Sequence, residues 1–102
     1  MPTDLQAAAY SAALHYLRGV KAAGSADTQP VLAAMKSTPV RDMYTQNGQI
    51  QANGKMVFDL YLMRVKSPAQ SKGAWDYLET VARIPAAESF PSAEASGCPL
   101  TL

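Results

Sequence analysis

Apolar residues recur at helical spacing near the start of the chain and predict a helix from Thr3 to Ala23. Thr3 followed by Gln6 fits a capping box, in which each side chain accepts a hydrogen bond from a backbone N–H that the first turn leaves unpaired. Gly24 stands where a left-handed residue would end the helix. The many alanines favour close approach to another element, such as a sheet. The apolar stripe consists of Leu5, Ala9, Ala12, Ala13, Tyr16, Leu17 and Val20.

A second, shorter helix is predicted from Asp27 to Lys36. Asp27 or Thr28 can cap it, and Pro30 lies in the first turn, where its missing N–H costs little. The helix ends before Pro39, because a residue that precedes proline disfavours the helical conformation. Two helices joined by a short glycine-containing link form a helical hairpin.

The pattern changes to that of strands and turns in the second half of the chain. Asn47-Gly48 and Asn53-Gly54 predict turns in exposed loops, with a short extended segment between them at 49–51. Residues 57–66 are predicted to form a strand, and almost every position in it is apolar, which is typical of a strand covered on both faces. Residues 75–84 fit either a helix or a strand. We favour a strand that pairs antiparallel with 57–66 across a long loop and ends at Pro85.

These elements predict an incomplete unit. A two-stranded hairpin is marginal by itself, and two helices can cover at most one of its faces. The missing cover therefore comes from the rest of a larger protein or from a second copy. The fold class we predict is an α+β fragment, with a helical hairpin followed by an antiparallel β-hairpin.

Composition narrows the class of partner. The net charge of +1 gives no electrostatic reason to expect nucleic acid or an anionic membrane. No apolar run approaches the roughly 20 residues that span a bilayer. The first residues have no basic leader and no continuous apolar segment, so they do not read as a signal peptide. The single cysteine, Cys98, is read either as a free thiol in the tail or as half of a disulfide whose partner lies outside this chain.

The chain carries no motif for catalysis. It has no glycine-rich phosphate loop, no nucleophile elbow and no Cys/His spacing for a metal. His15 is read as a packing or surface residue, and Asp59 as a structural acid paired with a nearby Arg or Lys. Trp75 and Tyr77 fit a stacking pair for sugars or bases, but more often such residues belong to a core or its rim. We predict no enzyme, no catalytic residue, no metal and no cofactor.

One long pattern does identify a family. Residues 7–25, 35–85 and 96–100, including NGQIQANGKMVFDLYLMRVKSPAQSKGAWDY, closely resemble the C-terminal part of the ligand-binding receptors of ABC transporters. These are type I periplasmic binding proteins of the leucine/isoleucine/valine-binding family. The resemblance covers nearly all of this chain and about the last quarter of a typical member. It implies a single C-terminal fragment of a two-lobed α/β fold, with 3–39 as the helical hairpin, 40–85 as strands and hairpin, and 86–102 as the tail.

The resemblance implies a function for the complete receptor. It would be a periplasmic, non-enzymatic solute-binding protein that closes around a small amino acid or an organic or aromatic carboxylate and delivers it to a membrane permease. By the same resemblance, the loop entering the first helix approaches the cleft, so the candidate ligand-binding residues are Thr3, Asp4, Leu5 and Gln6. The alternative is a truncated fragment that binds no solute and acts only as a self-associating interaction module, a homo-oligomer. A sensor domain that reuses the same fold is a third reading.

Overall fold

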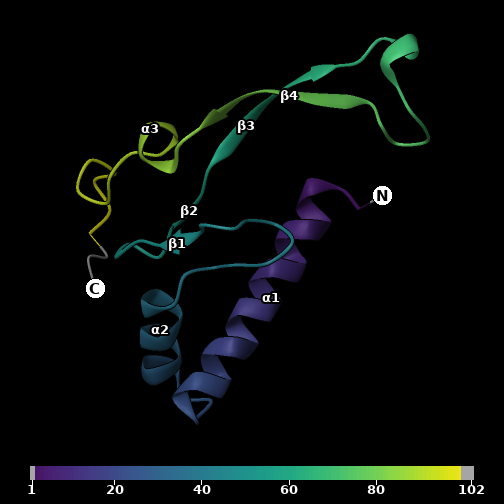
Figure 1. The fold of residues 1–102 in the computed structure, drawn as a ribbon. Coiled ribbons are helices and arrows are strands. Elements are labelled where there is room, and N and C mark those ends of the chain that lie inside the picture. Colours follow the sequence, from purple (N-terminus) through teal and green to yellow (C-terminus); the bar gives the residue numbers. More distant parts are fainter. Residues whose placement is uncertain (1, 100–102) are drawn as a thin grey trace.

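The computed structural model describes residues 2–99, so the end of the tail and of the segment 96–100 lies outside the described residues. Two helices are followed by two small antiparallel sheets and a short third helix (Figure 1). This agrees with the predicted α+β fragment. The elements are α1 (Asp4–Ala23), α2 (Thr28–Ser37), β1 (Gln49–Ile50), β2 (Met56–Val57), β3 (Leu60–Val65), the 3-10 turn η1 (Pro68–Gln70), β4 (Leu78–Ile84) and α3 (Ala86–Ser89).

Both predicted caps of α1 are confirmed. The Thr3 N–H donates to Gln6 Oε1 at 2.9 Å, and the Gln6 N–H donates to Thr3 Oγ1 at 3.3 Å. Gly24 adopts φ 64° and its N–H donates to the carbonyl of Val20, which closes the helix. Asp27 is the N-cap of α2 by position, but its side chain accepts a hydrogen bond from Ser25 and caps nothing.

The buried face of α1 differs from its apolar stripe. Ser11, His15 and Gly19 are the buried residues of this helix, while Leu5 is 80% exposed. The small face lets α2 approach closely, because a Cβ on Gly19 would lie 2.7 Å from Met35 Cγ. His15 is a packing residue, as predicted, and its Nε2 donates to the Met35 carbonyl at 3.0 Å. The small residues of α1 therefore pack closely against the helix α2 and not against a sheet. The apolar stripe of α1 is exposed to solvent.

The strand predicted at 57–66 is interrupted, and this corrects the sequence prediction. β2 pairs with β1, whereas β3 pairs with β4. The chain leaves one sheet for the other at Phe58 and Asp59. The Asp59 carboxylate is buried, accepts a hydrogen bond from the Ala86 N–H at 3.0 Å and forms an ion pair with Arg83. Asp59 is therefore the structural acid that the sequence predicted. Its contacts with Ala86 and Arg83 fix the chain where it passes from β2 to β3.

Gly48 corrects a second expectation. It is buried and does not lie in an exposed turn, because it exchanges backbone hydrogen bonds with Val40. A Cβ at this position would lie 2.7 Å from Thr45 Cγ2 and 2.9 Å from Met56 Cε, so only glycine fits without displacement. Gly54, by contrast, has φ 82° and does occupy a turn.

The β3–β4 ribbon extends away from the helical hairpin (Figure 1). Every residue of β3 is exposed. Trp75 takes a left-handed φ of 73° in the loop before β4, which starts at Leu78. The radius of gyration is 16.7 Å, whereas a compact domain of this length has about 13 Å. This chain therefore leaves the ribbon uncovered on both faces.

The segment after β4 folds back onto β1 and β2. Phe90 stacks against Phe58 at 5.5 Å between ring centroids, Lys55 lies over the Phe90 ring, and Asn53 donates to Ser96. Cys98 is half-exposed and forms no disulfide among the described residues. None of the helices within 2–99 combines the length and hydropathy needed to cross a membrane.

Candidate functional site

A cavity of about 260 Å³ lies where the start of α1 meets the break between β2 and β3. It is the place where the predicted residue Asp4 meets side chains from two distant segments. Its walls are formed by Asp4, Tyr44, Phe58, Asp59, Leu60 and Tyr61. An acidic group thus faces aromatic and aliphatic walls.

Tyr44 and Phe58 form an aromatic wall of this cavity, and contacts between rings hold it in place. The Tyr44 and Phe58 rings lie 5.2 Å apart at 60°, and Phe58 in turn contacts Phe90. Tilted aromatic pairs at this spacing are favourable beyond the area they bury. Phe58 reaches this position because Asp59 breaks the strand beside it.

Tyr44 is held from the other side by a turn around Asp42. The Asp42 carboxylate accepts hydrogen bonds from the Tyr44 N–H at 2.8 Å and from the Thr45 N–H at 3.3 Å. The Ser11 hydroxyl of α1 donates to it at 2.7 Å. The turn that carries Tyr44 is thereby tied to the helix that carries Asp4.

The charges of the cavity are unequal. Burial raises the pKa of Tyr44, and the nearby Asp4 carboxylate raises it further through its charge and a hydrogen bond. The Asn47 side chain, the Ala86 N–H and the Arg83 guanidinium together lower the pKa of Asp59 and outweigh its burial. Asp59 is neutralised by Arg83, whereas Asp4 forms none of the salt bridges found within residues 2–99. Asp4 is the negative charge that this cavity can offer to a ligand.

The four residues predicted for the site have different positions. The side chains of Thr3 and Gln6 form the capping box, and the side chain of Leu5 is exposed to solvent. Of the four, Asp4 is the one that lines the cavity. The sequence did not predict Tyr44, Phe58, Leu60 and Tyr61 for the site, because these residues lie far from Asp4 in the chain and no local pattern joins them to it.

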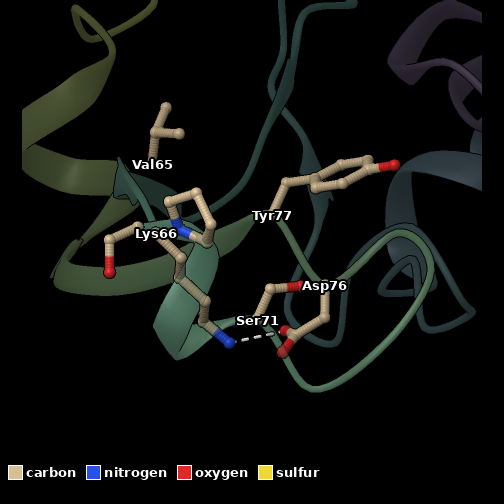
Figure 2. A pocket seen from close by; sticks show the side chains of 7 residues that line it. Val65, Lys66, Ser71, Asp76 and Tyr77 are labelled. Atoms are coloured by element: carbon tan, nitrogen blue, oxygen red, sulfur yellow. Dashed lines mark hydrogen bonds and ion pairs between the residues drawn. The ribbon is translucent and has the colours of Figure 1, made fainter.

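A larger cavity, of about 420 Å³, lies at the tip of the β3–β4 ribbon (Figure 2). Figure 2 shows the Lys66 side chain reaching Asp76, with Nζ 2.5 Å from Oδ1, while the Tyr77 ring points away from this pair. Asp76 Oδ2 accepts from the Lys72 N–H, and the Lys66 hydrogen bond is the main cause that lowers the pKa of Asp76. These charges satisfy each other, so this cavity offers a solute no free charge, and we prefer the cavity at α1.

We expect Ser11→Ala to destabilise the chain by about 1–2 kcal/mol at pH 7, because it removes a hydrogen bond to a charged group. Although burial opposes it, the Ser11 hydrogen bond, with the Tyr44 and Thr45 amides, lowers the pKa of Asp42. A carboxyl group whose pKa is lower in the folded than in the unfolded chain stabilises the fold fully at pH values above its unfolded pKa, which is about 3.9. That stabilisation is lost as the pH falls through the folded pKa.

Urea unfolding of wild type and Ser11→Ala from pH 7 down to pH 2 measures this effect. The difference between the two should shrink in the acid range. Ser25→Ala is the matched control, because Ser25 donates to Asp27 at an exposed site and should change stability by less than about 0.5 kcal/mol. Equal losses in both variants, or a difference independent of pH, would contradict the role assigned to Asp42.

Comparisons with known proteins were made for the whole chain. A family model described as periplasmic binding protein matches residues 1–74. No curated protein matches. A periplasmic binding protein from Burkholderia mallei is 44% identical, with a TM-score of 0.89 over 98% of this chain and 26% of that one.

A second solved structure is similar over the full length. It is described as a branched chain amino acid ABC transporter periplasmic ligand-binding protein from Burkholderia xenovorans LB400. It is 42% identical, with a TM-score of 0.91 over 100% of this chain and 27% of that one. The chain thus spans about a quarter of the length of the structures it matches.

Proposed function

This chain belongs to the periplasmic binding protein family, and from that premise we propose that it is the C-terminal segment of the solute-binding receptor of an ABC importer. Members of this family are non-enzymatic transport receptors, in agreement with the prediction that the chain is not an enzyme. The observation that carries the proposal is the 44% identity over 98% of the chain to a periplasmic binding protein. We assign 3–39 as the helical hairpin, 40–85 as the strands and hairpin, and 86–102 as the tail.

The complete receptor acts in the periplasm, closes on its solute and delivers it to a membrane permease. The relative from Burkholderia xenovorans, described as a branched chain amino acid ligand-binding protein, supports this class of solute. Thr3, Leu5 and Gln6 shape the entry to the site through the first turn of α1, and Asp4 contacts the solute.

The chemistry of the cavity favours an amino acid over a plain carboxylate. The carboxylate of Asp4, which has no salt-bridge partner within residues 2–99, attracts an ammonium group, and the Tyr44 hydroxyl beside it keeps that corner polar. Leu60 and Tyr61 line the apolar side. A branched-chain amino acid has both parts, whereas an organic carboxylate brings a negative charge to a negative site. The donors for the carboxylate group of the amino acid come from the rest of the receptor.

Calorimetry on the complete receptor tests this proposal with leucine, isoleucine, valine and benzoate as ligands. Asp4→Asn is expected to weaken amino acid binding by about ten- to hundredfold, because the amide can still accept a hydrogen bond but the negative charge that strengthens the contact with the ammonium group is lost. Asp27→Asn is the matched control, an N-cap acid on the other helix that lies outside the cavity. Unchanged affinity in Asp4→Asn would remove Asp4 from the site, and no binding of either ligand class would overturn the function.

The 102-residue chain alone is expected to bind none of these ligands with micromolar affinity. Its cavity is open, and about three quarters of the length of the matched structures has no counterpart in it. The same calorimetry on the isolated chain should give no saturable heat. Saturable binding there would mean that this segment holds the whole site.

A second function is favoured by the exposed surface. The chain exposes 7266 Å², whereas a compact protein of its mass exposes about 5,600 Å². As a separate chain it therefore acts as a self-associating module, a homo-oligomer that binds no solute. Light scattering distinguishes this from a monomer of 10.9 kDa.

A further inference from the structure

Asp59 is a buried carboxylate that lines the solute cavity and joins the segments that form its walls. It is 6% exposed and lies two residues before Tyr61, which lines the same cavity. Its three partners come from three separate segments, and they are the Asn47 side chain, the Arg83 guanidinium and the Ala86 N–H. A buried charge is costly unless it is paired and hydrogen-bonded, so these partners hold the carboxylate in one place.

The contact with Asn47 connects Asp59 to the aromatic wall. Thr45 Oγ1 donates to Asn47 Oδ1 at 3.3 Å, which leaves the amide group of Asn47 to donate to Asp59. Thr45 directly follows Tyr44, and both of their backbone N–H groups donate to the Asp42 carboxylate. Asp59 is thereby tied to the turn that places the Tyr44 ring.

The contact with Arg83 connects Asp59 to the opposite side of the cavity, formed by Leu60 and Tyr61 and called here the β3 wall. Tyr61 and Arg83 are directly opposite in the β3–β4 ladder, so their side chains leave the ribbon on the same face. From that face, Nε and Nη2 of Arg83 both reach Asp59 Oδ2. The ion pair therefore fixes the start of β3, and with it the β3 wall, relative to the carboxylate.

We propose that Asp59 is a positioning residue for the solute site: held between Asn47 and Arg83, it fixes the spacing of the aromatic wall and the β3 wall and so determines which aliphatic side chain fits. This inference rests on the proposed function, in which Asp4 binds the ammonium group and the β3 wall contacts the side chain of the solute. Asp59 is neutralised by Arg83, so its role is to hold the walls and not to bind the ammonium group.

The choice between leucine and valine is a sensitive measure of this spacing. The two amino acids carry the same ammonium and carboxylate groups and differ by one methylene, which in an apolar pocket changes binding by about 10- to 200-fold. A change in wall spacing therefore alters the ratio of the two affinities. A partial loss of the fold, by contrast, lowers both affinities by the same factor and leaves their ratio unchanged.

Calorimetry on the complete receptor with leucine and valine tests the inference. In wild type the two affinities are expected to differ by about tenfold or more. Arg83→Met should bring their ratio close to one, because β3 loses its tie to Asp59. Arg83→Lys keeps a charge near Asp59 and should stay closer to the wild-type ratio. Asn47→Ala cuts the connection to the aromatic wall and should act like Arg83→Met.

Arg64→Met is the matched control. Arg64 pairs with Glu79 on the same ribbon, with Nε 2.5 Å from Oε1, and neither residue lines the cavity. This variant should keep the wild-type ratio. Circular dichroism checks that each variant folds, and if Arg83→Met does not fold, Asn47→Ala decides the test.

The possible results separate this inference from the function on which it rests. A receptor that binds neither leucine nor valine would overturn the proposed function, and the positioning role with it. Equal affinities for leucine and valine in wild type would overturn the positioning role and leave the function standing. The same holds if Arg83→Met and Asn47→Ala leave the ratio unchanged, whether or not both affinities fall by a common factor.

Discussion

Replacing Val40 by aspartate is expected to unfold the isolated chain. Val40 is 1% exposed, and it and Val31 are the buried apolar residues of the described chain. A charge at this position would be buried without a partner, and the burial of the valine side chain would be lost as well, which together cost about 5 kcal/mol. Domains of this size are stable by about 5–15 kcal/mol, and so small a core puts this chain at the low end.

The loss should be visible in the helical circular dichroism signal at 25 °C. Val40 also exchanges two backbone hydrogen bonds with Gly48, at 2.7 and 3.1 Å, so the turn that carries Tyr44 would be lost with it. Met43→Asp is the control, because Met43 lies in the same turn and is 63% exposed. If both variants melt like wild type, Val40 does not hold the core.

Replacing Leu62 by aspartate is expected to have opposite outcomes in two settings. In the isolated chain Leu62 is about half exposed, so the free energy of unfolding should change by less than about 0.5 kcal/mol. In the complete receptor we expect the ribbon to be covered, and the same substitution should cost on the order of 3–4 kcal/mol.

Chemical denaturation of both proteins, each with and without the substitution, measures the contrast. Gln29→Asp is the control, because Gln29 is exposed in the first turn of α2, where a carboxylate is favourable, and it should be nearly neutral in both settings. Equal small effects in both settings would show that this face remains in water in the receptor and that the double-cover interpretation of 57–66 is wrong.

The features predicted correctly from the sequence depend on neighbours in the chain. The capping box joins Thr3 to Gln6, and Gly24 ends the helix within the same turn that it closes. The break at Asp59 was not predicted, because the Arg83 and Ala86 groups that hold it lie 24 and 27 residues away. Such contacts leave no mark on local periodicity.

The buried face of α1 could not be read from hydrophobicity. A stripe of apolar residues indicates which face a helix can bury, whereas the packing in this chain is decided by close approach at Gly19 and by the hydrogen bond of His15. Asp4 was predicted for the site from the resemblance to a family, and its role in binding stays a prediction. The aromatic wall was missed because Tyr44 and Tyr61 come together only after β2 and β3 separate.

The arrangement of the ribbon bears on cooperativity. α1 packs on α2 and α2 on β1, whereas β3 packs chiefly on β4. The link between these two parts is narrow, and it consists mainly of Phe58 between its aromatic neighbours and of the Asp59 ion pair. Parts that share few contacts open separately, so the helical hairpin and the ribbon should unfold as two units. No single melting temperature then describes this chain until a partner joins the two parts into one cooperative structure.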